Sequence, residues 1–430
     1  MDPISDGLLL VLILFLLLGA GIWVGVALLL VGGLGLLMSG IPVGDVIVTQ
    51  MWGSVTAWSL TPLPLFIWMG EILYRTDLAS NLFRGLAPIF RRFPGRLMHV
   101  NIGAAALFAS VCGSSTAMTA VLGRMSVSEL GGLGYDKGRT LGTVAAAGGL
   151  GILLPPSIVM IVYGAAAEVS IIQLFIAGII PGLMLAVMLS GYIVFDAFRN
   201  PHYYPASAWP ADTSWRDFLG IVPIMLMIIG MIASIYTGFA TATEAAAVGV
   251  VLALVIAAAN RQLTFAAFID SIRGSIRAHS MIVLILAGSS VLSTAMGFSG
   301  LPNHLAELVR SMNLSPGELL TILTVGFLVL GLFLDGLSIV LLTATIVLPM
   351  VKTAGIDPVW FGVYLVVMIE IGLLTPPVGF NLFVLSGTTN TPVGTVAKNV
   401  IPFLLVLLIF TLLISVFPDI VLHLPRQMSG

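Results

Sequence analysis

The chain has 430 residues, of which 59% are hydrophobic and only 8% are charged, and its net charge is −2. Soluble domains carry about 25% charged residues, so this composition excludes an ordinary soluble protein and indicates a polytopic membrane protein. The single cysteine, Cys112, excludes an intrachain disulfide and a cysteine metal cluster.

The N-terminal region predicts two short helices instead of one long span. The chain begins with Met-Asp-Pro and continues into the uncharged run Leu8–Met38 without a basic segment or a clear cleavage site, so we expect no cleavable signal. Gly19 and Gly21 divide this run, which is longer than a bilayer requires. A third span is predicted at Trp52–Tyr74, after a turn at Gly40–Gly44.

The first basic residues define an arm that we predict to lie along the membrane surface. The segment Arg75–His99 contains five arginines and one aspartate, and it includes a turn signal at Pro94–Gly95. Such a segment is typical of an interfacial amphipathic helix. Because Lys and Arg are retained on the cytoplasmic side, we place this arm in the cytoplasm.

The stretch 100–123 predicts a re-entrant hairpin with a small polar tip. Its middle, Cys112–Thr119, is rich in Ser and Thr, and the arms beside it are each about 10 residues, too short to cross a bilayer. The hydroxyl and free backbone groups of such a tip can bind a polar solute or a cation. Close packing of small residues between helices explains the composition equally well.

A proline pair interrupts the next apolar segment. A basic loop, Arg124–Arg139, leads into residues 139–168, which contain Pro155–Pro156. Because a proline has no N–H to donate, we expect free carbonyl groups at Gly151 and Ile152. In lipid each free carbonyl costs several kcal/mol unless it faces protein, water or an ion. Carbonyl oxygens without nearby charge suit Na⁺, whereas a kink filled by neighbouring helices needs no ion.

The same pattern occurs a second time at a constant offset of 221 residues. Gly134 matches Gly355, Gly151 matches Gly372, and Pro376–Pro377 repeats the proline pair inside the segment 359–389. The second pair is expected to free the carbonyl groups of Gly372 and Leu373. Two copies with the same glycine spacing favour ion-binding broken helices over accidental kinks, because transporters place coupling ions at such breaks.

The first half ends with a predicted span at 172–194 and a polar linker at 195–217. The second half then follows the order of the first. Its predicted segments are spans at 218–236, 245–259 and 281–298, an arm at 301–316, a hairpin at 319–350, and a last span at 401–417. The tip of this hairpin contains Asp335, a carboxylate inside an otherwise uncharged stretch, which indicates a functional role.

The two halves differ in the placement of positive charge. The second arm has Arg310 as its only basic residue, and the loop before the second proline pair has only Lys352. Equivalent elements on opposite sides of the membrane should differ in this way. We therefore predict an all-α polytopic membrane protein with two inverted repeats, residues 1–217 and 218–430, re-entrant hairpins and broken helices, as in elevator-type secondary transporters.

Two glutamates allow more than one explanation. Glu370 precedes Pro376 by six residues and is either an ion or proton site or a hydrogen-bonded structural carboxylate. Glu244 follows Thr241 at the spacing of a helix cap, which is its preferred explanation. The chain has no phosphate-binding loop, no His-Glu-x-x-His motif and no Gly-x-Ser-x-Gly motif, so ATP-driven transport and enzymatic activity have no support.

Several ordered motifs together resemble the large membrane subunit of TRAP (tripartite ATP-independent periplasmic) transporters, along nearly the whole chain. They are Cys-Gly-Ser-Ser-Thr-Ala from Cys112, Gly-Ile-Leu-Leu-Pro-Pro-Ser-Ile-Val-Met from Gly151, Ile-Tyr-Thr-Gly-Phe-Ala-Thr-Ala-Thr-Glu-Ala-Ala-Ala from Ile235, and Leu-Thr-Pro-Pro-Val-Gly-Phe-Asn-Leu-Phe-Val from Leu374. Cys112 stands where the family usually has Ser, and Ala242 replaces a usual Pro.

The resemblance implies a Na⁺-coupled elevator importer of small organic anions, a carboxylate or a sulfonate, in the bacterial inner membrane. Its implied partners are a small four-helix membrane subunit and a periplasmic solute-binding protein, in addition to membrane lipids and without nucleic acid. No cofactor is implied besides Na⁺ as the coupling ion. The implied sodium ligands are Cys112, Ser115, Gly151, Leu154 and Pro156 at one site and Gly372 and Thr375 at the other, and Ser114 and Asp335 would face the substrate.

Two other functions remain as alternatives. The nearer one is a stand-alone Na⁺/dicarboxylate symporter of the related elevator fold, which would transport without a binding protein. The more distant one is a non-transporting membrane scaffold or an intramembrane enzyme. The resemblance also implies that specificity for the substrate rests largely with the separate binding protein and not with this chain.

Overall fold

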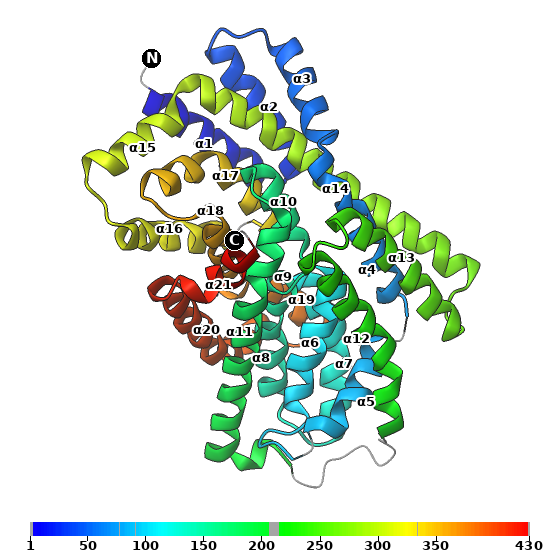
Figure 1. The fold of residues 1–430 in the computed structure, drawn as a ribbon. Helices are drawn as coiled ribbons and strands as arrows, with labels where there is room; N and C mark the ends of the chain where they lie inside the picture. Colours follow the sequence, from blue (N-terminus) through cyan, green and yellow to red (C-terminus); the bar gives the residue numbers. More distant parts are fainter. Residues whose placement is uncertain (1–2, 77, 91, 206–214, 333, 429–430) are drawn as a thin grey trace.

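The computed structural model describes residues 3–428 except 77, 91, 206–214 and 333. All regular elements in this part of the chain are helices, in agreement with the predicted all-α fold (Figure 1). Five of the described helices are long and apolar enough to cross a membrane, and up to seven spans result if each bent pair counts as one. The five are α11 (Ile171–Arg199), α12 (Trp215–Tyr236), α13 (Ala242–Ala259), α14 (Phe265–Ser299) and α20 (Val393–Val416).

The N-terminal run forms two helices, as predicted. Helix α1 (Pro3–Gly19) and α2 (Val24–Met38) are separated at Gly21, whose φ of 81° is accessible to glycine at little cost. The predicted third span is wrong, because the chain breaks between α3 (Val43–Val55) and α4 (Pro62–Tyr74), with a 3₁₀ turn at Trp58–Leu60. Pro62 begins α4 at a position where its missing N–H costs no helical hydrogen bond.

Both predicted arms are helical. Helix α5 (Leu78–Phe90) buries Leu82, Phe83 and Leu86 and packs against α6 (Met98–Cys112) and α12. Helix α15 (Leu301–Ser311) packs mainly against α17 (Gly336–Thr353). Each arm is therefore attached to a helix of its own hairpin.

Each predicted hairpin is a pair of helices with a short break between them. Helices α6 and α7 (Ser115–Gly132) contact each other, as do α16 (Pro316–Gly331) and α17. The predicted loop Arg124–Arg139 is wrong, because α7 continues to Gly132 and α8 (Lys137–Ala147) begins soon afterwards. Tertiary packing stabilises this extension, since the buried Ser126 hydroxyl donates a hydrogen bond of 2.8 Å to the Oδ1 atom of Asn101 on α6.

Both proline pairs break a helix, as predicted. In the first half α8 and the short α9 (Leu150–Leu153) meet α10 (Ile158–Ala167) at a bend of 44°. In the second half α18 (Pro358–Leu374) is separated from α19 (Phe380–Thr389) by residues 375–379. The peptide bonds Pro155–Pro156 and Pro376–Pro377 are both cis.

The helix boundaries themselves repeat at the offset found in the sequence. Helices α7 and α17 begin and end 221 residues apart, and so do the first residues of α8 and α18. One difference is large: the residues equivalent to α3 and α4 together form the single helix α14 of 35 residues. The predicted span 281–298 is therefore only the second part of a helix that begins at Phe265, where Thr264 accepts a hydrogen bond from the N–H of Ala267 (3.1 Å).

The other corrections concern segment ends. The first five residues of the predicted linker 195–217 belong to α11, and residues 206–214 lie outside the described part of the chain. After α20 the chain adds a short helix, α21 (Asp419–Met428), which packs against α11. The core is centred on α18, of which every residue from Trp360 to Leu374 is buried.

Candidate functional site

A cavity of about 520 Å³ lies where the two hairpin tips and the two helix breaks meet. The first tip contributes Gly113–Thr116 and the second contributes Leu334–Leu337. Ile152 and Ile158 flank the first break on this cavity, and Leu373 and Phe380 flank the second. The structure thus brings together the four segments that the sequence singled out.

Each tip packs against the broken helix of its own half. Gly113 has a φ of 58°, and a Cβ atom at this position would lie 2.8 Å from Cγ1 of Ile158 at the start of α10. A Cβ atom on Gly336 would lie 2.7 Å from Cγ2 of Ile369 on α18. Glycine is therefore required at both tips for the close approach.

Ser114 and Asp335 both line the cavity and occupy equivalent positions, 221 residues apart. Ser114 is the N-cap of α7, and its hydroxyl accepts a hydrogen bond from the N–H of Ala117 (3.3 Å). Asp335 is the N-cap of α17, where its carboxylate accepts from the N–H of Leu337 (3.2 Å) and from the Ser338 hydroxyl. The N-termini of two helices consequently face one cavity, which favours a negatively charged ligand.

The first break is buried throughout, from Gly151 to Ser157. The N–H of Leu154 is donated to Leu150 (2.9 Å), and Pro155 has none to give, so the backbone supplies no helical donor to the Gly151 carbonyl. The expectation for Ile152 is wrong, because the Ser157 hydroxyl donates a hydrogen bond of 2.6 Å to its carbonyl.

The prolines of the first break face away from the cavity. Pro155 and Pro156 border a small apolar pocket whose other walls include Phe66 and Phe175. Leu154 is buried as well. Because the side chains of Leu154 and Pro156 contain no polar atom, any ion ligand that these residues supply must be a backbone carbonyl.

The second break combines a tight contact with a partly satisfied backbone. A Cβ atom on Gly372 would lie 2.7 Å from the Cα of Gly331, so this glycine is required for packing of α18 on α16. Its carbonyl is not free as predicted, since it accepts from the N–H of Thr375 (3.2 Å), although a carbonyl oxygen retains a second lone pair. The Thr375 hydroxyl donates to the carbonyl of Ile371 (2.6 Å).

The remaining proposed ligands lie near the first tip. Ser115 lines the cavity and is buried. Cys112 is the last residue of α6, directly before Gly113, and its side chain lies outside the described part of the structure. Thus Ser114, Ser115 and Asp335 line the cavity itself, whereas the proposed ligands in the two breaks lie beside its lining residues Ile152 and Leu373.

A polar contact that the sequence did not reveal joins the two halves beside this cavity. The side-chain amide of Asn381 on α19 donates to the Ser115 hydroxyl oxygen (2.8 Å) and lies 3.4 Å from Oε1 of Glu370 on α18. In the sequence, Glu370 stands out as a carboxylate close to a proline pair. Asn381 lies in the motif that begins at Leu374, but its contact with Ser115, 266 residues away in the chain, has no local sequence signal.

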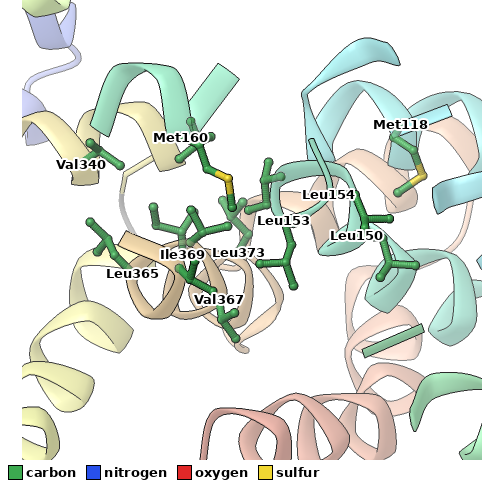
Figure 2. Packing of buried hydrophobic residues seen from close by; sticks show 14 of the residues in the cluster. Met118, Leu150, Leu153, Leu154, Met160, Val340, Leu365, Val367, Ile369 and Leu373 are labelled. Carbon is green, nitrogen blue, oxygen red and sulfur yellow. The ribbon is translucent and has the colours of Figure 1, made fainter. Parts of the chain in front are cut away.

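Apolar side chains pack around the two breaks. Helices α9 and α18 contact each other, and Figure 2 shows Leu153 and Leu373 within one group of packed side chains together with Met160. All three residues are buried, and Leu373 also borders the cavity. Water is therefore excluded from the breaks on the side of Leu153 and Met160, which strengthens electrostatic interactions nearby.

Comparison with known proteins gives a consistent result. Residues 10–420 match the family model "Tripartite ATP-independent periplasmic transporter, DctM component". The C4-dicarboxylate TRAP transporter large permease protein DctM of Pseudomonas aeruginosa is 34% identical over 86% of this chain and 87% of its own length.

A second relative is longer than this chain. The isethionate TRAP transporter permease protein DctMQ of Oleidesulfovibrio alaskensis is 29% identical, and the match covers 95% of this chain but only 64% of the relative. Among solved structures, the YdaH transporter of Alcanivorax borkumensis superimposes with a TM-score of 0.60 at 15% identity, covering 86% of this chain and 88% of that one. This likeness confirms the fold of a polytopic transporter with broken helices.

Proposed function

The chain belongs to the DctM component family of TRAP transporters, and on this basis we propose that it imports a small organic anion driven by a Na⁺ gradient. Membership makes it the large permease of such a system, a multi-pass protein of the bacterial inner membrane and not an enzyme. Beyond this membership, we propose the coupling ion, the substrate class and the residues that bind them.

The proposal that the substrate is an anion rests on one observation: two helix N-termini lie at one cavity. The N-terminal ends of α7 and α17, at Ser114–Thr116 and Asp335–Leu337, line the same space of about 520 Å³. The N–H groups that the caps leave free and the positive dipole ends attract negative charge. The lining residues include no Lys or Arg, and the carboxylate of Asp335 is engaged by the N–H of Leu337 and the hydroxyl of Ser338. By name, the relatives carry a C4-dicarboxylate and isethionate, a small sulfonate, which both fit such a site.

The proposed Na⁺ sites lie in the two breaks. We assign Gly151, Leu154 and Pro156 to the first, with Cys112 and Ser115 from the adjacent tip, and Gly372 and Thr375 to the second. The donor set fits Na⁺, because the backbone carbonyl and hydroxyl oxygens are neutral and a hard monovalent cation prefers oxygen. At Gly151 the helix supplies no backbone donor, so the carbonyl is available to an ion.

The proposed movement follows from the position of these sites. The two hairpins and the two broken helices would move together as the transport domain, and the other spans would form the scaffold. We assign residues 1–217 and 218–430 to two inverted repeats, supported by the recurrence of helix boundaries at one offset and by the unequal basic charge of the two arms.

Two partners are proposed. One is a small four-helix membrane subunit, supported by the relative named DctMQ, which extends well beyond the length matched by this chain. The other is a periplasmic solute-binding protein that delivers the anion. Such delivery would leave the choice of substrate largely to that protein.

Uptake into proteoliposomes tests this function. The complex of both membrane subunits and the binding protein is reconstituted, and entry of a radiolabelled C4-dicarboxylate or isethionate is measured with an inward Na⁺ gradient. We expect uptake to require both Na⁺ and the binding protein. Unchanged uptake without Na⁺ would contradict the coupling, and full uptake by this chain alone would support the stand-alone symporter instead.

A further inference from the structure

A closed group of polar side chains lies beside the cavity. It consists of Glu370 on α18, Asn381 on α19, and Ser115 and Thr119 on α7, which we call the Glu370 cluster. Of these residues, only Ser115 has a role in the mechanism proposed above. The exposed fractions are 1% for Glu370, 0% for Asn381 and Thr119, and 3% for Ser115. Polar groups buried this deeply need partners, because their desolvation is otherwise uncompensated.

The cluster joins the first hairpin to the second broken helix. Asn381 donates to the Ser115 hydroxyl oxygen at 2.8 Å and lies 3.4 Å from Oε1 of Glu370. Ser115, Thr119 and Gly123 lie four residues apart, on one face of α7. This face packs on α19, where Gly123 lies against Leu385, one turn after Asn381. Thr119 is therefore inside the same interface as Asn381.

Three oxygen atoms of the cluster lack a hydrogen-bond partner. They are Oε2 of Glu370, Oδ1 of Asn381 and Oγ1 of Thr119, all without contact to solvent. The carboxylate and amide oxygens can only accept, and the ion pairs among the described residues do not include Glu370. Leaving all three oxygens unsatisfied would be costly, so a ligand that attracts oxygen atoms is needed.

Two adjacent glycines, Gly148 and Gly149, allow the backbone of the first broken helix to lie directly against the side chains of Ser115 and Glu370. A Cβ atom on Gly148 would lie 2.6 Å from Oγ of Ser115 and 2.8 Å from Oε1 of Glu370. A Cβ atom on Gly149 would lie 2.9 Å from Cγ of Glu370. Gly149 is also the residue 221 positions before Glu370, so equivalent points of the two halves meet here. The cluster is thus enclosed by both broken helices and the first hairpin.

We propose that the Glu370 cluster binds one monovalent cation of the size of Na⁺, with ligands from Glu370, Asn381 and Thr119. A proton on Glu370 would supply one donor and so satisfy at most two of the three oxygens, its own and one acceptor, whereas a single cation could coordinate all three. One carboxylate balances one positive charge, so the site is neutral when occupied, which a divalent ion would not achieve. This third cation site rests on the Na⁺ coupling proposed above and differs from the sites in the two breaks.

Equilibrium binding of radioactive Na⁺ to the purified full chain tests the site. The variants are Glu370→Gln and Thr119→Val, and the matched control is Thr411→Val, a buried threonine whose hydroxyl bonds to Leu407 of its own helix. Ser115 is left unchanged because it is also assigned to the first break. Loss of a ligand or of its support lowers metal affinity about tenfold or more. At a Na⁺ concentration about tenfold above the one that half-saturates the wild type, occupancy of this site should therefore fall from about 0.9 to about 0.5 or less in each variant, whereas Thr411→Val should bind as many ions as the wild type.

The outcomes separate this site from the proposed function. Variants that bind as many ions as the wild type would overturn the Glu370 cluster as a cation site and leave Na⁺ coupling intact. A wild-type chain that binds no Na⁺ would overturn both. If Glu370→Gln does not fold, the ion count of Thr119→Val alone tests the site. Thr119→Val removes only a hydroxyl that makes no hydrogen bond, so this variant should fold.

Discussion

At the first helix break every residue from Gly151 to Ser157 is buried, whereas at the second Pro377 and Val378 are exposed. The first break is closely covered by α11, because Gly178 and Gly182 let that helix approach Leu153 and Leu154. At the second break Gly372 packs on Gly331, and Gly379 packs on the carbonyl oxygens of Leu373 and Thr375. Pro377 and Val378 between these contacts stay exposed. The proline pairs therefore set where each helix breaks, and the neighbouring helices set how accessible the break is.

The two breaks also differ in how their carbonyl groups are satisfied. The hydroxyl of Ser157 donates to Ile152 in the first break. Val378 occupies the equivalent position in the second, so Leu373 receives no such hydrogen bond. The difference suggests unequal ion sites, with the second one reached more easily from outside the core.

Gly331→Leu should have the largest effect. A Cβ atom there would lie 2.5 Å from the Cα of Gly372, so a leucine forces α16 and α18 apart at the second break. Overpacking of this kind costs about 1–3 kcal/mol, occasionally more. We expect a lower melting temperature of the purified chain and loss of uptake. Gly326→Leu on the same helix, where no atom lies within 4 Å of the added Cβ, is the control. Equal melting temperatures of the two variants would show that the contact does not hold the second break.

Ser157→Ala tests the hydrogen bond that distinguishes the first break. It leaves the buried carbonyl of Ile152 without a donor and removes the cap of α10, to which the N–H of Met160 donates (3.3 Å). We expect a loss of about 2 kcal/mol in the free energy of unfolding, measured by thermal or denaturant melting. Ser415→Ala is the control, because that hydroxyl bonds only within its own helix. If both variants melt alike, the hydroxyl of Ser157 does not stabilise the break.

Asp335→Ala separates capping from transport. Asp335 caps α17 on the cavity, and Asp357 caps α18 at an exposed position away from it, accepting from the N–H of Val359 (2.7 Å). Replacing either cap with alanine should cost about 1 kcal/mol. Only Asp335→Ala should also lower the rate of substrate uptake, because its helix N-terminus faces the anion. Equal uptake by Asp335→Ala and Asp357→Ala would remove Asp335 from the substrate site.

Val378→Ser should have the smallest effect. It places a hydroxyl at the position equivalent to Ser157, on a side chain that is already 36% exposed. Surface substitutions usually change stability by no more than about 0.5 kcal/mol. We expect an unchanged melting temperature together with a shift in the Na⁺ concentration for half-maximal uptake, because the hydroxyl would donate to the Leu373 carbonyl, directly after the proposed ligand Gly372. An unchanged Na⁺ response would show that the difference between Ser157 and Val378 does not affect the second site.

The sequence revealed most of the features that depend on local chemistry. The breaks follow from the missing proline N–H, and the tips follow from short arms around small polar residues. Ser114 and Asp335, which the family resemblance assigned to the substrate, both line the cavity, and their contact with substrate stays a prediction. Features that depend on distant contacts were missed. Asn381 has its partner in the other half of the chain, and the Ser157 bond involves a side-chain donor, whereas the proline argument counts only backbone donors.

The errors in helix boundaries have the same origin. Charged residues between Arg124 and Arg139 suggested a loop, but burial of Ser126 against Asn101 keeps most of that segment helical. The break between α3 and α4 has no counterpart in α14, although the two regions are equivalent in the repeat. Propensity alone does not separate these cases, because tertiary packing stabilises α14, with α2 against residues 284–295 and α4 against Ser271 and Ser275.

The Na⁺ dependence of initial uptake rates tests the central claim, that two paired breaks bind the coupling ions. The reconstituted complex is assayed over a range of Na⁺ concentrations, with choline replacing Na⁺ at constant ionic strength. We expect a sigmoidal dependence with a Hill coefficient above 1, because at least two Na⁺ ions bind before transport. A rate that is independent of Na⁺, or a hyperbolic dependence with a Hill coefficient of 1, would contradict the assignment of an ion to each break.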